Sequence, residues 1–486
     1  MFIGDILLAQ GLVTRADIAA ALERQKLQGG RLGDNLVALG KLKASDLEAV
    51  IHGAPPAPQN IADTGIGLLE LLNLMMKAMY SASAETPSKI AGVLKLTHRT
   101  TQALIEQAQE RKLLSVLGST AMHSLSELRF ALTEKGKQWA QDAMALNQYI
   151  GPAPVSLAAY SERIMRQRIT NERVDRAAID RAFENLVVAK DIIRQLGPAI
   201  NSGRSILLYG PPGNGKTSIA ERVNRVFTDM IYIPYCIDVE GQIIKIFDAG
   251  FHKPAQRNES PNKGIAVRRE EFDQRWVACQ RPFVVTGGEL TLEMLDLSFN
   301  TQSKFYEAPL HVKAFGGTFV IDDFGRQLVS PEALLNRWIS PLESRTEGLK
   351  LHTGKAFTLP FDELVIFSTN LSPRDLMDPA FLRRIPYKLE VRGPDRQQFR
   401  EIFRSAAARA GMEVPDAIVD RVIASLIAEP DGLAGFQPKF IIDQVAAICK
   451  FEGIPPQFRE EFVEMALHNL SVRDGSSESS TEAIAA

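Results

Sequence analysis

The segment Ser205–Thr217, SILLYGPPGNGKT, constrains the fold more than any other part of this chain of 486 residues. It contains the pattern G-x-x-x-x-G-K-T between a short apolar run at 206–209 and a helix-like segment at 218–227. The apolar run predicts a buried parallel strand. Glycines allow successive backbone N–H groups to face one concavity, and a helix N-terminus adds partial positive charge. In this context the pattern predicts a phosphate-binding P-loop rather than a glycine-rich turn that matches by accident.

The P-loop residues have expected roles. Lys216 can reach the β- and γ-phosphates of ATP, and the hydroxyl of Thr217 can bind Mg²⁺. The sequence therefore predicts ATP and Mg²⁺ as cofactors. The residues expected around the phosphates are Gly210, Pro211, Pro212, Gly213, Asn214, Gly215, Lys216, Thr217 and Ser218.

Two later apolar runs end in polar side chains. Residues 317–323 read GTFVIDD, which predicts a strand followed by two carboxylates. Asp322 is expected to hold Mg²⁺, which prefers hard oxygen ligands, and Asp323 to orient and polarise the attacking water. The run at 364–368 is followed by Thr369 and Asn370, and the amide of Asn370 can help to place that water.

These motifs, in this order, resemble the AAA+ ATPase family over about residues 179–470. The resemblance implies a multidomain chain with an α/β parallel-sheet P-loop core at 156–392. It also implies a C-terminal α-helical lid at 393–472. Such a protein uses ATP hydrolysis to change conformation, so we expect an ATPase that remodels a protein partner, which the sequence does not identify.

The same resemblance assigns further roles. Asn370 takes the sensor 1 position, and Lys439 falls near sensor 2. Arg383 and Arg384 lie in the arginine-finger region, and of the two we favour Arg384. Because a finger acts on the ATP of a neighbouring subunit, the resemblance implies a homo-oligomer, commonly a hexameric ring. A finger raises the rate by roughly 10³–10⁵.

The chain departs from the family pattern at two of these positions. Asp323 stands where glutamate is usual and is shorter by one methylene, and a displacement near 1 Å can cost on the order of a hundredfold in rate. Lys439 stands where arginine is usual and lacks its planar fork. A slowly hydrolysing ATP-dependent switch is therefore an alternative to a fast motor.

The segment between the two nucleotide motifs is long, because Lys216 and Asp322 are 106 positions apart (322 − 216). We expect an insertion at about 243–315. Within it, Phe251 is interpreted either as a substrate-gripping aromatic or as packing for a small subdomain, and Arg268-Arg269 forms a basic pair. Outside the insertion, we expect one amphipathic helix over 174–196 and a strand over 231–235.

The first fifty residues contain an internal repeat with an offset of 29, since Ile3-Gly4 recurs as Leu32-Gly33 (33 − 4). Each copy predicts a short helix, a turn at glycine and a second helix, with Thr14 or Ser45 as its N-cap. Two copies of one unit indicate a small all-α domain.

Residues 1–54 resemble the MshEN-type N-terminal domain of type II secretion and pilus assembly ATPases. The best-characterised members bind cyclic di-GMP, so the resemblance implies a nucleotide site here, the alternative being a structural docking module. The chain departs from the motif at Phe2 and Ala54, which replace an arginine and a glutamine. The matching residues are Gly4, Gln25, Arg31, Leu32 and Gly33.

After a proline-rich linker at 53–60, residues 61–148 resemble a winged helix-turn-helix domain of α+β type. The third helix of such domains enters the major groove of DNA. The region is only weakly basic, so DNA binding and protein docking stay equally open. The expected helices are 68–80, 87–93, 98–112 and one beginning at 133–136, the expected strands are 113–117 and 128–132, and the candidate base readers are His98, Arg99, Thr101 and Gln102.

Bulk properties restrict the cellular setting. The net charge is −2, no apolar run approaches the roughly 18 residues of a membrane helix, and no signal peptide is visible. Cys236, Cys279 and Cys449 lack metal-ligand spacing and predict buried free thiols in a reducing compartment. The polar tail at 473–486 predicts disorder. We therefore expect a cytoplasmic AAA+ ATPase with cyclic di-GMP as a candidate regulator, and a DNA-binding transcription regulator is the alternative.

Overall fold

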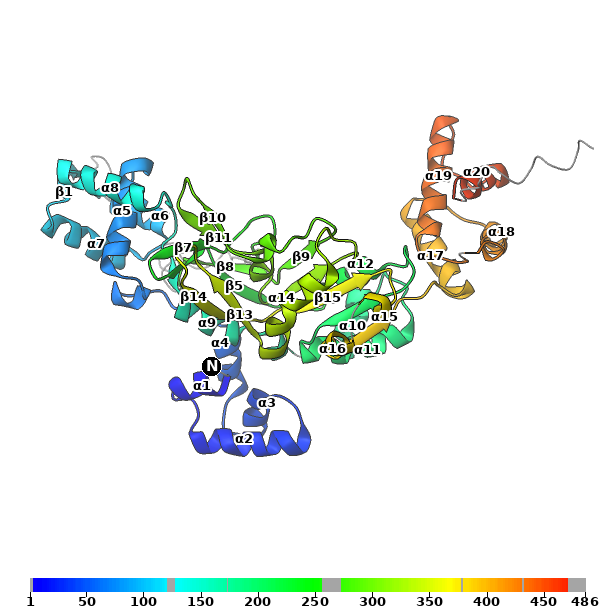
Figure 1. Cartoon of the computed structure of the whole chain (residues 1–486), viewed down its shortest axis with the longest axis horizontal. Coiled ribbons are helices and arrows are strands. Elements are labelled where there is room, and N and C mark those ends of the chain that lie inside the picture. The colour runs from blue at the N-terminus through cyan, green and yellow to red at the C-terminus, as the bar shows by residue number, and fades with distance from the viewer. Residues whose placement is uncertain are drawn as a thin grey trace, which may run out of the picture.

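The computed structural model has an elongated shape with an α/β body at its centre (Figure 1). A small domain of helices at residues 3–52 lies below this body in the view. A second small domain lies at one end of the body, and the C-terminal helices lie at the other. The structure describes residues 3–119, 127–172, 174–255, 272–376, 379–430 and 432–470. Outside these ranges lie Phe2, the Arg268-Arg269 pair and the tail at 473–486.

The body is built on a five-stranded sheet in the order β16-β4-β15-β12-β9, and its neighbouring strands are parallel. Ile366 lies opposite Ile206, and Leu364 lies opposite Thr318. Buried parallel strands are expected to be largely apolar, and the three central strands are mostly apolar and buried, whereas the edge strand β16 contains Lys388 and Glu390. The strands are β4 (Ile206–Tyr209), β9 (Phe283–Thr286), β12 (Thr318–Ile321), β15 (Leu364–Thr369) and β16 (Tyr387–Glu390).

Alternate residues of these strands face different hydrophobic cores, because successive strand side chains point to opposite faces. Leu208 and Ile366 pack with three helices on one face. Leu207 and Phe367 share the other core with the helix that follows β12. The helices are α10 (Arg176–Phe183), α11 (Lys190–Ser202) and α12 (Lys216–Arg225) on the first face and α14 (Pro331–Ser344) on the second.

The single helix expected over 174–196 is wrong, because α10 ends at Phe183 and α11 begins at Lys190. The chain between them places both Leu186 and Val188 against the same core. Residues two apart lie on different sides of a helix, so a continuous helix could not bury both. The break therefore increases apolar burial.

A second, mixed sheet, in the order β10-β11-β7-β6-β3, joins three strands of the expected insertion to two strands that precede it. The bounds 243–315 expected for the insertion also include β9, which belongs to the parallel sheet. The strand expected over 231–235 exists as β5 (Met230–Pro234), but it pairs with β8 (Trp276–Gln280) outside the parallel sheet. Phe251 is half-buried against the body's core, which favours packing over substrate gripping. The mixed-sheet strands are β3 (Val155–Ser156), β6 (Cys236–Val239), β7 (Gln242–Lys245), β10 (Ser298–Asn300) and β11 (Phe305–Glu307).

A hairpin made of β13 (Thr346–Lys350) and β14 (Ala356–Pro360) connects α14 to β15, and its tip contacts the inserted sheet. The His352 ring stacks on Phe299 with centroids 4.0 Å apart, and its backbone N–H donates to the Tyr306 hydroxyl at 3.0 Å. Lys355 pairs with Glu240 at 2.8 Å. The hairpin therefore joins the parallel sheet to the insertion.

The elements expected over 61–148 are present, with a two-stranded antiparallel hairpin between the third and last helices. Thr101 is fully buried, so its role as a base reader is wrong; it faces the core because it lies one turn from buried Leu104 and Ile105. His98 and Arg99 are exposed. The elements are α5 (Leu68–Ala82), α6 (Pro87–Leu94), α7 (His98–Glu110), β1 (Leu114–Ser119), β2 (Leu128–Leu132) and α8 (Glu134–Leu146).

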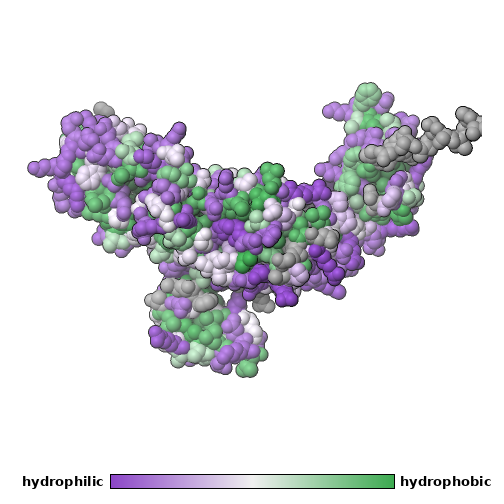
Figure 2. All heavy atoms as spheres, viewed as in Figure 1, coloured by the Kyte–Doolittle hydropathy of each residue, from purple (hydrophilic) through white to green (hydrophobic). Residues whose placement is uncertain are grey.

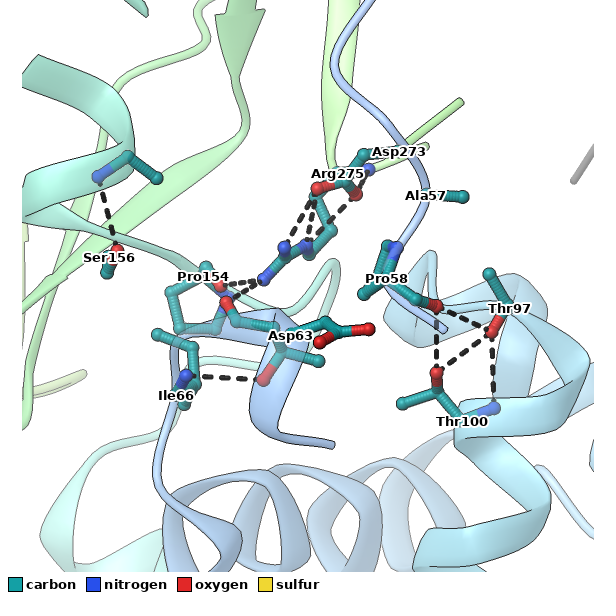
Figure 3. Close-up of polar contacts among 12 residues, drawn as sticks. Ala57, Pro58, Asp63, Ile66, Thr97, Thr100, Pro154, Ser156, Asp273 and Arg275 are labelled. Carbon is teal, nitrogen blue, oxygen red and sulfur yellow. Dashed lines mark hydrogen bonds and ion pairs between the residues drawn. The ribbon is translucent and has the colours of Figure 1, made fainter. Parts of the chain in front are cut away.

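Buried polar contacts fix this domain to the body (Figure 3). The Arg275 guanidinium donates to the Asp273 carboxylate at 2.8–3.1 Å and to the carbonyls of Thr64 at 2.8 Å and Pro154 at 2.9 Å. One side chain thus connects the domain at 61–148, the insertion and the segment before β3. Nearby, Thr97, the N-cap of α7, donates to the Pro58 carbonyl at 3.2 Å.

The N-terminal helices follow the repeat with one correction. Thr14 caps α2 and forms a capping box with Asp17, as expected for an N-cap. Ser45 is not the second N-cap, because α4 begins at Ala44 after Lys43 and the Ser45 hydroxyl instead contacts Asp46. Apolar atoms gather on this domain in Figure 2. The helices are α1 (Ile3–Ala9), α2 (Arg15–Gln28), α3 (Leu32–Ala38) and α4 (Ala44–His52).

The C-terminal helices have a separate core centred on Phe399, Phe403 and Val445. The three cysteines are buried free thiols, as predicted. Within the described part of the chain, each helix is too short or too polar to span a bilayer. The helices are α17 (Arg396–Arg409), α18 (Asp416–Ile427), α19 (Gln437–Phe451) and α20 (Glu460–Leu470).

We predict that Arg275→Ala lowers the unfolding free energy by about 3–5 kcal/mol, because it leaves the buried Asp273 carboxylate without its cation. Their side chains are 5 % and 4 % exposed. Urea titration followed by tryptophan fluorescence measures the change. The matched control is Arg176→Ala, whose ion pair with Asp180 is exposed and contributes at most about 1 kcal/mol. Equal losses in the two variants would contradict the prediction.

Candidate nucleotide-binding site

The loop between β4 and α12 is shaped by three glycines with positive φ. Gly210, Gly213 and Gly215 have φ of +137°, +75° and +81°. A Cβ atom on Gly210 would lie 2.4 Å from the Val391 carbonyl oxygen, and one on Gly213 would lie 2.4 Å from the Phe436 ring. Side chains at these positions would therefore force the loop open, and only glycine allows this tight curve without strain.

Lys216 opens α12 and turns its ammonium group back into this curve. Its Nζ donates to the carbonyl oxygens of Gly210 at 2.9 Å and Pro211 at 3.0 Å, and to Asn370 Oδ1 at 2.5 Å. Burial lowers the pKa of Lys216, while the nearby carboxylates act in the opposite direction. The ammonium is thus held by neutral oxygens in a part-buried site, where an anionic phosphate would be a stronger partner.

The polar residues that follow β12 and β15 meet Lys216 and Thr217 at the same edge of the sheet. The Thr217 hydroxyl donates to Asp322 Oδ2 at 2.7 Å, and Asn370 Nδ2 donates to Asp323 Oδ1 at 3.0 Å. β15 lies between β4 and β12, so Asn370 stands between the P-loop and the two carboxylates. Thr217 and Asp322 together offer the hydroxyl and carboxylate oxygens that Mg²⁺ prefers, so these residues fit the metal.

The C-terminal helices contact the outer side of the P-loop. Asn214 Oδ1 accepts from the Gly435 N–H at 2.9 Å, so this amide faces the segment before α19 rather than the inside of the loop. Phe436 lies over Gly213. Lys439 is exposed in the first turn of α19, three residues beyond Phe436. Pro211, Pro212 and Ser218 are exposed around the loop.

Arg383 and Arg384 lie at the other end of the sheet. The Ser205 hydroxyl, just before β4, donates to the Arg384 carbonyl at 3.3 Å, whereas the P-loop follows the last residue of β4. Four strand residues separate these ends by about 13 Å, at roughly 3.3 Å each. Arg384 Nε donates to Glu343 Oε1 at 2.5 Å, and Arg383 is exposed beside a cavity of about 600 Å³. Neither arginine therefore joins the P-loop of its own chain.

Two cavities lie between the N-terminal domain and the body, although the domain and the body also touch directly through Met165. The larger, about 930 Å³, is lined by Gln25, Arg31, Leu32 and Gly33 from the repeat and by Asn171 from the body. The Arg31 guanidinium donates to the Asn171 carbonyl. Four of the matching motif residues therefore share one cavity.

The last matching residue, Gly4, and the departing residue Ala54 lie outside this cavity. Gly4 lines the smaller neighbouring cavity of about 540 Å³. Ala54 is exposed after α4. A Cβ atom on Gly33 would lie 2.8 Å from a terminal methyl group of Leu47, so the packing of α3 on α4 favours glycine there. The glycine of the second motif thus has a structural reason independent of any ligand.

Sequence reasoning missed Gln327, whose side-chain amide contacts the backbone of both Asp322 and Asp323. A glutamine six residues after the end of a strand carries no distinctive signal in a single sequence. Its role becomes visible only when the loop after β12 is seen to fold back on itself.

Comparisons with known proteins match parts of the chain. A family model described as a domain of unknown function (DUF8689) matches residues 395–469, which contain the C-terminal helices. A search among curated proteins found no match.

Solved structures gave matches of low similarity. A RuvB mutant from Thermotoga maritima matches with a TM-score of 0.33 and 15 % identity, covering 63 % of this chain and 73 % of that one. NtrX from Brucella abortus matches with a TM-score of 0.37 and 14 % identity, covering 61 % and 58 %. The Thermotoga maritima RuvB Holliday junction branch migration motor matches with a TM-score of 0.33 and 17 % identity, covering 59 % and 71 %. At these TM-scores the likeness supplies no evidence on function.

We predict that Lys216→Ala weakens binding of Mg²⁺–ATP by about 10- to 100-fold, because a charge-assisted hydrogen bond contributes roughly 1.5–3 kcal/mol. Titration with a fluorescent ATP analogue measures the affinity. Lys190→Ala, an exposed lysine at the start of α11, is the control and should bind as the unaltered protein does. An unchanged affinity in Lys216→Ala would show that the P-loop assignment is wrong.

Proposed function

We propose that this protein is an AAA+ ATPase that binds Mg²⁺–ATP at the P-loop and hydrolyses it to ADP and phosphate. One observation carries the proposal: Lys216, Thr217, Asp322, Asp323 and Asn370 come from three strand ends and form two adjoining hydrogen-bonded groups. A structural loop has no need for an ammonium, a hydroxyl, two carboxylates and an amide at one point. Phosphoryl transfer needs all of them, since it depends mainly on positioning and charge stabilisation.

Each residue has a chemical task in this proposal. When bound, Mg²⁺ neutralises charge that develops on the phosphates. Thr217 and Asp322 supply the oxygens that hold it, and Lys216 exchanges its carbonyl partners for phosphate oxygens. Asp323 accepts the proton of the attacking water through its carboxylate. Asn370 orients that carboxylate from the neighbouring strand.

The arginines at the far end of the sheet support an active homo-oligomer, which we propose is a hexameric ring. Since Arg383 and Arg384 lie away from their own P-loop, they can serve only the nucleotide of another copy. Arg384 is engaged with Glu343, whereas Arg383 is exposed. We therefore favour Arg383 as the finger and Arg384 as its anchor, which reverses the preference drawn from the sequence.

We also propose that the ATPase cycle moves the lid and the insertion to remodel a protein partner. The Gly435–Asn214 hydrogen bond connects the P-loop with the lid. On the other side, the hairpin before β15 contacts the inserted sheet through His352 and Lys355. These contacts give two physical routes by which a change at the nucleotide reaches other domains. Lys439, near the lid contact, is proposed as the sensor 2 residue.

For the domain at 61–148 we propose protein docking rather than DNA binding. The first turn of α7 would carry the base readers. Its N-cap Thr97 is instead bonded to the Pro58 carbonyl, and Thr97 and His98 line a cavity of about 200 Å³ with Phe272 of the insertion. An incoming DNA duplex would compete with these internal contacts. A transcription regulator that reads DNA is therefore the weaker alternative.

We propose, as a second ligand, cyclic di-GMP in the 930 Å³ cavity between the N-terminal domain and the body. The cavity brings Gln25 and Arg31 together with body residues. Arginine pairs with phosphate in bidentate fashion and stacks on bases. A ligand there would contact both domains and could change how they sit on each other.

The ATPase proposal predicts that Arg383→Ala binds ATP normally but hydrolyses it roughly 10³–10⁵ times more slowly. Phosphate release and nucleotide titration measure the two properties. A mixture of Arg383→Ala with Lys216→Ala chains should regain partial activity, because one supplies the P-loop and the other the finger. Full activity of Arg383→Ala alone would contradict action between copies.

The second-ligand proposal predicts that titration calorimetry of the intact protein with cyclic di-GMP gives a binding isotherm. Arg31→Ala should weaken binding at least about tenfold, the effect of one lost charge-assisted contact. Arg176→Ala, on α10 outside the cavity, should bind as the unaltered protein does. The absence of binding heat in the intact protein would rule the ligand out.

A further inference from the structure

Asp323 has an unusual backbone conformation for a residue with a side chain. Its φ is +47°, in the left-handed region, directly after β12. Aspartate and asparagine are enriched in this region because their short polar side chains are tolerated there. A conformation of this kind is unfavourable and persists only where the surrounding structure imposes it. The contacts that impose it are therefore informative about the site.

The Gln327 side chain bridges the turn that contains Asp323. Its Nε2 donates to the Asp322 carbonyl at 3.0 Å and lies 3.3 Å from the Asp323 carbonyl. It also lies 3.4 Å from the carbonyl of Gly287, which follows β9. Its Oε1 accepts from the Gly325 N–H at 2.8 Å. One amide thus satisfies backbone groups on both sides of Asp323.

The same turn is fixed to β15, the strand that carries Asn370. The Phe324 N–H donates to the Ser368 carbonyl at 2.7 Å, and the Thr369 hydroxyl donates to the Phe324 carbonyl at 2.8 Å. The Phe324 ring is fully buried. These contacts therefore fix the position of Asp323 relative to Asn370. Asn370 Nδ2 donates to Asp323 Oδ1 at 3.0 Å.

We infer that Gln327 is a positioning residue that holds Asp323 in the left-handed conformation, so that the short carboxylate meets Asn370 at the nucleotide site. Aspartate is then suited to this turn and is not a shortened substitute for the usual glutamate. A glutamate at 323 would be less tolerated in this backbone conformation, and its longer side chain would overshoot Asn370. The expected effect on kcat rests on the proposed ATPase function. The role of Gln327 in holding the conformation of Asp323 does not depend on that function.

Two variants test the inference in the full chain. Gln327→Met keeps the length of the side chain and removes its hydrogen bonds, and Asp323→Glu restores the usual acid. For Gln327→Met we expect an unchanged KM for ATP and a kcat lower by on the order of a hundredfold, the cost of a displacement near 1 Å. For Asp323→Glu we expect a lower kcat as well. Gln397→Met, an exposed glutamine on α17, is the matched control and should keep full activity.

Crystal structures of the unaltered protein and Gln327→Met provide a readout that does not depend on turnover. We expect residue 323 to leave the left-handed region in the variant and its contact with Asn370 to be lost. A positive φ with an intact Asp323–Asn370 contact in Gln327→Met would overturn the inference, as would a higher kcat in Asp323→Glu. If the unaltered protein binds ATP but shows no turnover, the proposed function fails, while the two structures still decide the role of Gln327.

Discussion

The site depends on three parallel strands ending at one edge of the sheet. β4, β15 and β12 are neighbours in that order, so the polar residues that follow them meet although they are far apart in sequence. Lys216 bonds to Asn370, and Asn370 bonds to Asp323. The amide between them contacts a cation on one side and an anion on the other. A shift of β15 relative to either neighbour would break one of these contacts.

The elements added to this sheet are connected to it by specific contacts. The β13–β14 hairpin leads directly into β15 and touches the inserted sheet with its tip. The insertion in turn contacts the domain at 61–148 through Arg275, which is paired with the buried Asp273 and donates to the Thr64 carbonyl. A buried ion pair contributes little net stability compared with apolar packing, but it strongly disfavours any arrangement that leaves one charge alone. The pair therefore holds the Arg275 guanidinium in place, and its hydrogen bonds to the Thr64 and Pro154 carbonyls fix the domain against the body.

Several local expectations were accurate because their causes are local. The P-loop glycines, the Thr14 capping box and the strand at 206–209 each depend on residues within a few positions. Other expectations were wrong where tertiary packing decided the outcome. Leu186 and Val188 interrupt a helix to reach one core, and Thr101 faces inward because its turn of α7 packs there.

The sequence alone determined which chemical groups are present and which strand ends carry them: a glycine-rich loop with a lysine, a pair of carboxylates and an amide. It also indicated the repeat of the N-terminal helices through its period. Only the tertiary structure decided the strand order, the distance of Arg383 from its own P-loop and the left-handed turn at Asp323. The physical reason is that parallel pairing joins strands far apart in the chain, and no local pattern encodes which strands become neighbours.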